Sequence, residues 1–412
     1  MITKKKWTIF SLRILCAFGM FLYTGCGKKE AMPPGPPPQV SFISPHLLDG
    51  YDTILRDVNI AVNAQAMDDK YIEKVEFYVD DVLLPDGIVT EPPFEYKWEA
   101  TDQFGVPRKI TVLAYDNRGV RTSASMDVKF FNGVQKAPMP TKRYAFTTAV
   151  ANNKIYVIGG FEFHFNLVEE YDPATNTWTT KASSTFPHAA HASCVIDGQI
   201  YVFGGGTDKK LVTDVEAYNP ATDTWTTKSP IPFDKGAPAS LTSCAVINGK
   251  AYLMGGMSDP EPAYVAEYDP VADSWRMTNS FIQEYSAEAL NLNNVLYFIG
   301  GCPDKSMGVC ASPSNILQSY DPLADTWISH QSMNTPYSSH CATLANGKIY
   351  IMGGTEKGST ATRTVMEVYN PDSDSWTQLA NMPEGLINFG CETVDGLIYI
   401  IGSEHVYQYT PD

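Results

Sequence analysis

The sequence predicts an all-β protein built from two unlike β-domains, of which the second is longer and repetitive. Aromatic residues make up 12% of the chain, and 30 glycines and 28 prolines supply many turns. Nothing has the period of a long amphipathic helix. Five stretches of the form VEEYDPATNTW recur, and each reaches a Trp seven residues after its Tyr. A chain of 412 residues has room for two or three domains.

The first 25 residues are typical of a secretory signal peptide, with a basic start, an apolar middle from Ile9 to Leu22 and small residues before Cys26. The end of this segment resembles a bacterial lipobox, although Tyr23 stands where that family usually has Leu. The resemblance implies lipidation of Cys26. Gly27, in place of an Asp, implies retention at the outer membrane. Secretion without a lipid and an uncleaved anchor are the alternatives.

The charge of the chain argues against nucleic acid as a partner. Residues 1–25 contain four basic and no acidic residues, so their removal changes the net charge from −16 to −20. Such a chain repels phosphate backbones and anionic lipid. Residues 26–39 are rich in Pro and predict an extended spacer. We therefore expect contact with a membrane through the lipid anchor only.

Residues 40–131 predict a β-sandwich of the immunoglobulin type, because short alternating strands are separated by turn residues. The expected strands are 40–45, 58–66, 72–80, 94–100, 108–116 and 123–131. Their order resembles bacterial Ig-like domains, whose motifs match Ile72–Asp81, Pro92–Trp98 and Ala114–Gly119, with Asp81 in place of a preferred Gly. A Cys…Trp…Cys framework is missing, so Trp98 and the aliphatic residues must fill the core. We expect no binding site in this domain.

Residues 132–412 contain six repeats. Each has a small-residue strand, a turn, an apolar strand ending in Gly-Gly or, in the sixth, Gly-Ser, and then a Tyr-containing stretch. The stretches that contain the turn, the apolar strand and its final Gly-Gly or Gly-Ser are ANNKIYVIGG (151–160), IDGQIYVFGG (196–205), INGKAYLMGG (247–256), LNNVLYFIGG (292–301), ANGKIYIMGG (345–354) and VDGLIYIIGS (394–403). This pattern resembles the kelch repeat, which implies a six-bladed β-propeller with four strands in each blade.

The repeated residues have physical roles in a scaffold. Asn-Gly and Asp-Gly close tight hairpins, and tandem glycines permit a positive φ and close backbone approach. The Tyr and Trp side chains are large enough to fill the wedge between neighbouring sheets. We therefore interpret these residues as structural and not as a reaction centre.

The last repeat ends three residues after Tyr409, before any Trp-containing strand. The segment GVQKAPMP (133–140) aligns with the Trp-containing strands and has Gly133 in the Trp position. It precedes the first repeat, so it can supply the missing outer strand of the sixth blade and remove an exposed edge. The sequence predicts that Tyr407 or Tyr409 lies beside Val134–Lys136.

The candidate site consists of residues that break the repeat at the loops before the inner strands and after Gly-Gly, which lie on one face in kelch-type propellers. Aligned positions before the inner strands are Arg143, His188, Ala239, Glu284, Tyr337 and Leu386; then Phe146, His191, Thr242, Ala287, His340 and Phe389; then Thr147, Ala192, Ser243, Glu288, Cys341 and Gly390. We expect these rings at the mouth of the central channel. The candidate ligand-binding residues are Arg143, Phe161, Phe163, His164, His188, His191, Glu284, Tyr285, Tyr337 and His340.

Two functions fit these residues, and a third possibility is a purely architectural role in which the propeller docks onto another envelope protein. The first is an envelope lipoprotein whose propeller binds a protein or a glycan without catalysis, because aromatic residues in FEFHFN (161–166) suit stacking on sugar rings or contact with a protein surface. Those aromatics could equally pack against the neighbouring blade or domain. The alternative comes from the sialic-acid epimerase branch of kelch proteins, a sugar epimerase or mutarotase in which Glu288, Arg143 and His340 do acid–base work. Nucleophile-elbow, zinc-protease and phosphate-loop motifs are missing from the sequence, which favours binding.

The cysteines predict one disulfide, between Cys302 and Cys310, which bracket a short loop. Cys194, Cys244, Cys341 and Cys391 lie in apolar strands and are expected to be small buried packing residues. His188 and His191 are three residues apart, and such a pair points to opposite faces of a strand, so we expect no metal. We expect no cofactor and a monomer.

Overall fold

The computed structural model describes the chain from residue 35 to residue 411 with gaps: 35–45, 53–67, 70–101, 104–162, 165–207, 211–235, 239–257, 264–281, 284–303, 310–355, 357–359 and 361–411. Two units can be separated, Met1–Pro36 and Pro37–Asp412, and the second contains both β-domains. In the part of the chain that is described, no helix has the length and hydropathy of a membrane span.

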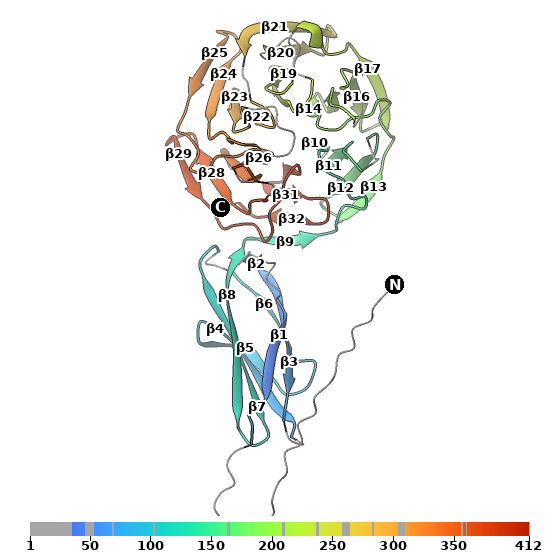
Figure 1. Ribbon diagram of the computed structural model, residues 1–412. Coiled ribbons are helices and arrows are strands. Elements are labelled where there is room, and N and C mark those ends of the chain that lie inside the picture. Colours follow the sequence, from blue (N-terminus) through green and yellow to red (C-terminus); the bar gives the residue numbers. More distant parts are fainter. Residues whose placement is uncertain are drawn as a thin grey trace, which may run out of the picture. The chain divides into compact units, whose positions relative to one another are not determined.

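The first β-domain is a sandwich of two sheets (Figure 1). Its strands are β1 (Gln39–Ser44), β2 (Thr53–Leu55), β3 (Asp57–Gln65), β4 (Ile72–Val79), β5 (Val82–Val89), β6 (Glu95–Glu99), β7 (Arg108–Asp116) and β8 (Arg121–Phe131). One sheet has the order β1-β3-β6 and the other β2-β8-β7-β4-β5. Buried aliphatic and aromatic side chains from both sheets form one core, in which Trp98 packs edge-on against Phe130.

The strand β5 is one that the sequence pattern did not predict. Its sequence, VLLPDGIV, contains Pro85 and Gly87, which are poor strand residues. Proline is tolerated there because β5 lies at the edge of its sheet, where half of the backbone N–H groups need no partner. The short β2, which pairs in parallel with β8, was also not predicted.

The second β-domain contains, within the described residues, six four-stranded antiparallel sheets, which we call blades 1 to 6 (Figure 1). Blade 1 is β10 (Thr147–Ala151), β11 (Lys154–Ile158), β12 (Val168–Asp172) and β13 (Thr177–Thr180); blade 2 is β14 (Ala192–Ile196), β15 (Gln199–Phe203), β16 (Val215–Asn219) and β17 (Thr224–Lys228). Blade 3 is β18 (Ser243–Ile247), β19 (Lys250–Met254), β20 (Tyr264–Asp269) and β21 (Ser274–Phe281); blade 4 is β22 (Glu288–Leu292), β23 (Val295–Ile299), β24 (Leu317–Asp321) and β25 (Thr326–Ser329). Blade 5 is β26 (His340–Ala345), β27 (Lys348–Gly353), β28 (Met366–Asn370) and β29 (Ser375–Gln378). A short 3-10 helix, Phe233–Lys235, follows blade 2.

Blade 6 joins the two ends of the repeat region. It consists of β30 (Gly390–Val394), β31 (Leu397–Ile401), β32 (Val406–Tyr409) and β9 (Gly133–Lys136), in that order. Tyr407 lies opposite Gln135, and Tyr409 lies opposite Gly133. The predicted pairing of the C-terminal strand with the segment that precedes the first repeat is therefore confirmed.

A circle of backbone hydrogen bonds links the six loops that lead into the inner strands. Each loop has one residue at positive φ, and the N–H of that residue donates to the carbonyl of its counterpart in the preceding blade, with N···O distances from 2.8 to 3.3 Å. The six residues are Ala145, Ala190, Leu241, Ser286, Ser339 and Asn388. The Ala145 N–H donates to the Asn388 carbonyl, so the circle includes the junction between blades 6 and 1.

The Tyr, turn and Trp residues of the repeat hold neighbouring blades together. In five blades the Tyr hydroxyl donates to the side chain of an Asp or Asn in the following turn, at 2.6–2.8 Å. The same turn side chain accepts from a backbone N–H of the preceding blade, and in four blades the Trp indole donates to a carbonyl there. These residues are scaffold, as the sequence indicates.

Phe131 replaces the missing Trp in blade 6. In the other five blades the Tyr and Trp rings lie with centroids 4.8–5.1 Å apart. In blade 6 the ring of Phe131, at the end of β8, lies 5.3 Å from the ring of Tyr409 and is fully buried. A Cβ on Gly133 would lie 2.3 Å from this ring, which explains why Gly occupies the Trp position.

Candidate functional site

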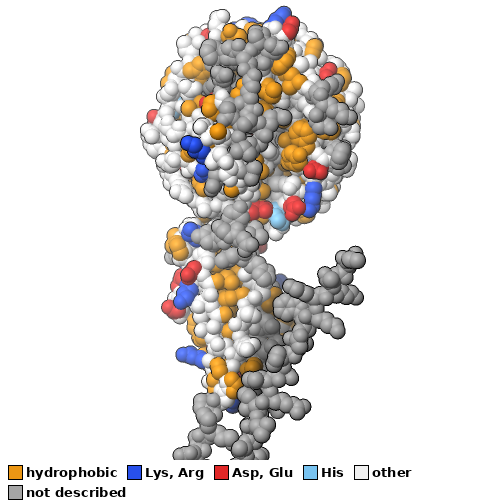
Figure 2. All heavy atoms as spheres, in the orientation of Figure 1, with side chains coloured by type: hydrophobic (Ala, Val, Ile, Leu, Met, Phe, Trp, Pro, Cys, Tyr) orange, Lys and Arg blue, Asp and Glu red, His pale blue; other side chains and the backbone are white. Residues whose placement is uncertain are grey.

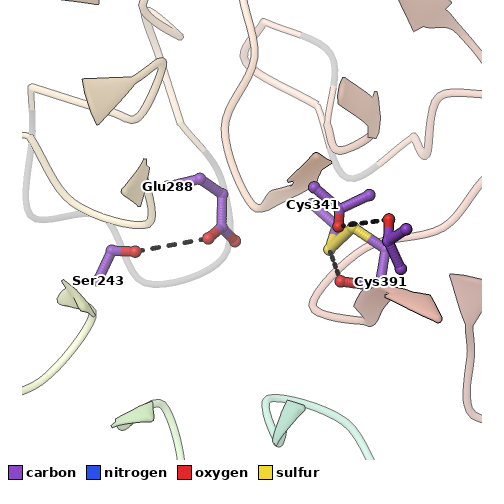
Figure 3. The surroundings of a disulfide bond; sticks show 6 residues. Ser243, Glu288, Cys341 and Cys391 are labelled. Atoms are coloured by element: carbon purple, nitrogen blue, oxygen red, sulfur yellow. Dashed lines mark hydrogen bonds between the residues drawn. A yellow bond between two sulfur atoms is a disulfide. The ribbon is translucent and has the colours of Figure 1, made fainter. Parts of the chain in front are cut away.

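A cavity of about 400 Å³ lies on the axis of the propeller, lined by the inner strands of all six blades and the loops that lead into them. Glu288 and the sulfur atoms of Cys341 and Cys391 lie on different sides of this central space (Figure 3). Hydroxyl groups line much of the wall, among them those of Thr147, Thr148 and Ser193. None of the described residues that line the cavity is Lys or Arg.

Two carboxyl groups, those of Glu288 and Glu392, share this cavity. The Ser243 hydroxyl accepts a bond from the Ala289 N–H at 2.7 Å and donates to Glu288 at 3.5 Å. Burial, together with the nearby charge of Glu392, raises the pKa of Glu288 to about 8. Burial raises the pKa of Glu392 to about 7, against a lowering hydrogen bond from Thr148. Near neutral pH the two carboxyl groups therefore offer both a hydrogen-bond donor and an acceptor.

Replacing Glu288 by Gln is expected to stabilise the protein at alkaline pH. The folded-state pKa of Glu288 is raised, so the folded chain binds more protons than the unfolded chain between about pH 4.5 and pH 8, and stability falls as the pH rises through this window. Gln is neutral at every pH, so it avoids this loss. We expect a gain on the order of 1–3 kcal/mol at about pH 9 and little change at about pH 5. Urea unfolding at the two pH values measures it.

The exposed Glu73, in the first β-domain, provides the matched control, because its replacement by Gln removes one charge without touching the cavity. Equal gains at pH 5 and pH 9 for Glu288→Gln would contradict the assignment of Glu288 as a buried acid whose ionisation lowers the stability of the folded protein.

The residue three or four positions before each inner strand, which we call the pre-strand residue, does not line the axial cavity. Arg143 is fully buried and forms an ion pair with Glu169 in β12, and its Nε donates to the Gly159 carbonyl at 2.9 Å. His188 makes the equivalent contacts in blade 2, with the Gly204 carbonyl at 2.7 Å and Glu216 at 3.2 Å.

Tyr337 and Glu284 are the pre-strand residues of blades 5 and 4. Tyr337 is buried and its hydroxyl donates to Glu367 of β28 at 3.3 Å. The Oε2 of Glu284 is buried and has no hydrogen-bond partner among the described residues, and burial raises the pKa of Glu284 to about 7. The adjacent Tyr285 is buried and bridges to Cys302 through the backbone. Arg143, His188 and Tyr337, which were expected at the mouth of the channel, therefore do not line the axial cavity.

His191 and His340, each three residues after a pre-strand residue, do line the cavity. The Nε2 of His191 lies 2.7 Å from the Thr147 hydroxyl, and its Nδ1 is buried without a partner. Both ring nitrogens of His340 are buried and have no hydrogen-bond partner among the described residues. Burial lowers the pKa of His340 to about 3, so its ring is neutral at physiological pH. The structure thus brings His340 and Glu288 to one cavity but leaves Arg143 outside it.

A second, smaller cavity of about 240 Å³ lies beside the channel mouth between blades 6 and 1. It is lined by Arg143, Tyr144, Glu384 and Glu404 among others, and it shares Asn388 and Phe389 with the axial cavity. The Tyr144 ring is 44% exposed and stacks on Phe161 at 5.5 Å, and Phe161 meets Phe165 edge-on.

Sequence reasoning missed Tyr144, although an aromatic residue next to a pre-strand position was a usable signal. Phe163 and His164 lie outside the described residues. Figure 2 shows hydrophobic side chains, in orange, exposed on the propeller face that it presents. The exposed Tyr144 and the half-buried Phe161 together offer a partly exposed aromatic surface.

Two disulfides are present among the described residues. Cys302 and Cys310 are bonded, as the short loop between them predicts. Cys341 and Cys391 are also bonded, which corrects the expectation that they are only packing residues: they lie on β26 and β30, the inner strands of adjacent blades, and face each other across the junction (Figure 3). Cys26 lies outside the described residues. Within the described ranges, no group of three or more His, Cys, Asp or Glu is placed to hold a metal ion.

Comparisons with protein families agree with this architecture. Residues 126–301 match the KLHDC2/KLHL20/DRC7 Kelch-repeats domain, residues 336–383 match the Kelch motif, and residues 38–158 match the bacterial Ig domain. The match to the bacterial Ig domain, together with the disulfides, indicates an extracytoplasmic bacterial protein.

Similar proteins share the repeat region. Kelch-like protein 23 of Pongo abelii is 30% identical over 274 residues, which cover 63% of this chain and 46% of that protein. Kelch repeat and BTB domain-containing protein 1 of Cowpox virus (strain Brighton Red) is 26% identical over 265 residues, covering 61% of this chain and 45% of that protein. The chain thus spans less than half the length of these curated relatives.

The solved structure of YjhT matches the fold with a TM-score of 0.54 and 18% identity, covering 66% of this chain and 95% of that one. At this identity the likeness shows the fold alone. The chain therefore carries a bacterial Ig-like domain followed by a kelch-repeat propeller domain.

Proposed function

We propose that this chain is an envelope lipoprotein whose propeller binds a neutral, hydroxyl-rich glycan without catalysis. The observation that carries the proposal is the axial cavity, whose wall combines hydroxyl groups with two carboxyl groups and contains no Lys or Arg among its described residues. The cavity volume of about 400 Å³ is in the range of small-molecule sites.

The polar groups of the cavity favour a neutral sugar over a sugar acid. The ionised member of the Glu288–Glu392 pair would repel the carboxylate of sialic acid, and no described cationic side chain in the wall could offset that repulsion. Sugar hydroxyls both donate and accept hydrogen bonds, as the threonine and serine hydroxyls and a half-protonated carboxyl pair require. The exposed Tyr144 ring supports the same ligand class, because the apolar face of a sugar ring stacks on an aromatic ring.

The arrangement gives less support to a sugar epimerase or mutarotase. Acid–base catalysis needs groups that converge on one reacting centre with pKa values near the working pH. Arg143 is neutralised by Glu169 outside the cavity, and the pKa of His340 is near 3, which makes it a weak base. Only Glu288 of that trio has a suitable pKa inside the cavity.

The lipid anchor and the outer membrane belong to the same proposal and rest on the segment around Cys26. An anchored protein would incorporate a labelled fatty acid, and a Cys26→Ala variant would not.

A glycan array followed by calorimetry tests the binding proposal. We expect neutral glycans to be retained and sialylated glycans to be absent among the ligands. Tyr144→Ala and Thr148→Val should each weaken binding about tenfold, since the loss of one stacking or hydrogen-bonding partner is worth about 1.4 kcal/mol. Tyr71→Ala is the matched control, because Tyr71 is 65% exposed in the first β-domain.

Two outcomes would contradict the proposal. If the array retained sialylated glycans only, neutral glycans would be excluded as the ligand class. Rapid anomer exchange of a bound sugar, followed by NMR and abolished in Glu288→Gln, would show catalysis.

A further inference from the structure

Two thiols that the axial site does not need, those of Cys194 and Cys244, lie on the inner strands of adjacent blades. Cys194 is in β14 of blade 2 and Cys244 is in β18 of blade 3. Both are unbonded, both line the axial cavity and both pack against the same hydrophobic cluster between these blades.

The strand register shows which way each thiol points. Alternate residues of a strand face opposite sides, here the preceding and the following blade. Between blades 5 and 6, Cys341 bonds to Cys391 and the Thr343 hydroxyl meets that of Thr393 at 3.1 Å. On an inner strand, therefore, the register positions of Cys341 and Thr343 face the following blade, and those of Cys391 and Thr393 face the preceding one.

By this rule Cys194 and Cys244 point into the same junction, and Cys244 lies two residues along its strand from the position directly opposite Cys194. Cys194 pairs with Tyr201 as Thr343 pairs with Tyr350, so it faces blade 3. Cys244 pairs with Leu253 as Cys391 pairs with Ile400, so it faces blade 2.

The chemistry of the pair favours a cross-link over a reactive site. Burial, followed by the hydrogen bond with Cys194, raises the pKa of the Cys244 thiol well above its ordinary value. A raised pKa disfavours the thiolate, which is the nucleophile and the metal ligand. Oxidation is therefore expected while the blades assemble, before the thiols are buried.

We infer that Cys194 and Cys244 form a third disulfide in the protein outside the cytoplasm, tying blade 2 to blade 3 as Cys341–Cys391 ties blade 5 to blade 6. The two thiols lose two protons and two electrons as the S–S bond forms. The disulfide of a thiol–disulfide oxidoreductase accepts them and becomes a dithiol. Such bonds persist in an oxidising compartment.

Peptide mapping of the exported full chain tests this inference. The protein is denatured with N-ethylmaleimide without reductant, digested and analysed by mass spectrometry. We expect a peptide linked through Cys194 and Cys244 beside the linked pairs Cys302–Cys310 and Cys341–Cys391, which serve as internal controls. Alkylation of both Cys194 and Cys244 in molecules that retain the Cys341–Cys391 link would overturn the inference.

A Cys194→Ser variant gives a second readout and preserves size and polarity in the cavity wall. Cys244 should then become alkylated without reduction, which adds one maleimide to the chain. If Cys244 in this variant still escaped alkylation, it would be bonded to another cysteine and the assignment would be wrong.

Discussion

Replacing Phe131 by Ala is expected to lower the free energy of unfolding by about 3–5 kcal/mol, although Phe131 lies outside the repeats. Its ring is fully buried among residues of blades 5 and 6 and stacks on Tyr409. Removing it leaves a cavity where the other five blades have a Trp. Because β9 and β32 hold the two ends of the propeller together, the loss falls on the junction that closes blade 6. Phe131→Leu should cost less, because it keeps most of the volume.

The effect is measured by urea unfolding followed through Trp fluorescence, which reports on the repeats because five of the seven Trp residues lie there. The exposed Tyr71→Ala is the control for loss of an aromatic ring and should change stability by less than about 0.5 kcal/mol. If Phe131→Ala were no more costly than Tyr71→Ala, the ring would not be filling the Trp space.

Coupling between Phe131 and Gly133 gives a stricter test. A Cβ on Gly133 would lie 2.3 Å from the Phe131 ring and 2.8 Å from the Gln408 carbonyl. Gly133→Ala alone should therefore destabilise blade 6. In the double variant Phe131→Ala/Gly133→Ala the clash with the ring disappears, so the total loss should be smaller than the sum of the two single losses. Additive losses would mean that the two residues do not compete for one space.

The repeats made most of the propeller predictable from the sequence. The Tyr, turn and Trp residues act at short range within a blade and at a fixed offset between blades, so their spacing alone specified the blades. The position of Gly133 in the Trp register specified the pairing with Tyr409. What replaces the missing Trp could not be read in this way, because Phe131 lies two residues before that register position and belongs to β8.

The site was less predictable because it depends on which way each side chain faces. Cys341 and Cys391 lie on the inner strands of adjacent blades, one register position apart, and their side chains meet across the junction. No local sequence pattern predicts such a contact between two blades. Glu392 shares the cavity with Glu288 although the two lie on blades that are not adjacent. One signal for the pre-strand contacts was present in the sequence. Arg143 and His188 each have a Glu at the equivalent position of the third strand, Glu169 and Glu216. In blade 3 the corresponding residues are both Ala, Ala239 and Ala266.

Replacing Arg143 by Met is expected to cost about 3–5 kcal/mol, because Glu169 would remain buried without its cation. The double variant Arg143→Met/Glu169→Gln should recover most of this loss, since no charge is then left in the interior. Urea unfolding measures both, and glycan binding measured on the same proteins separates a structural role from a ligand-binding one. A stable Arg143→Met protein that no longer binds the glycan would show that Arg143 contributes to ligand binding.

The neighbouring blade supplies a replacement that should be tolerated. In blade 2, His188 contacts the Gly204 carbonyl and Glu216, and these are the equivalents of the Gly159 carbonyl and Glu169 that Arg143 contacts. Arg143→His can therefore keep both kinds of contact with a smaller side chain, and we expect it to lose less stability than Arg143→Met. If His were as damaging as Met, the two blades would not share one interaction. A loss for Arg143→His smaller than that for Arg143→Met would support a structural role for the pre-strand residue as a partner of the third strand.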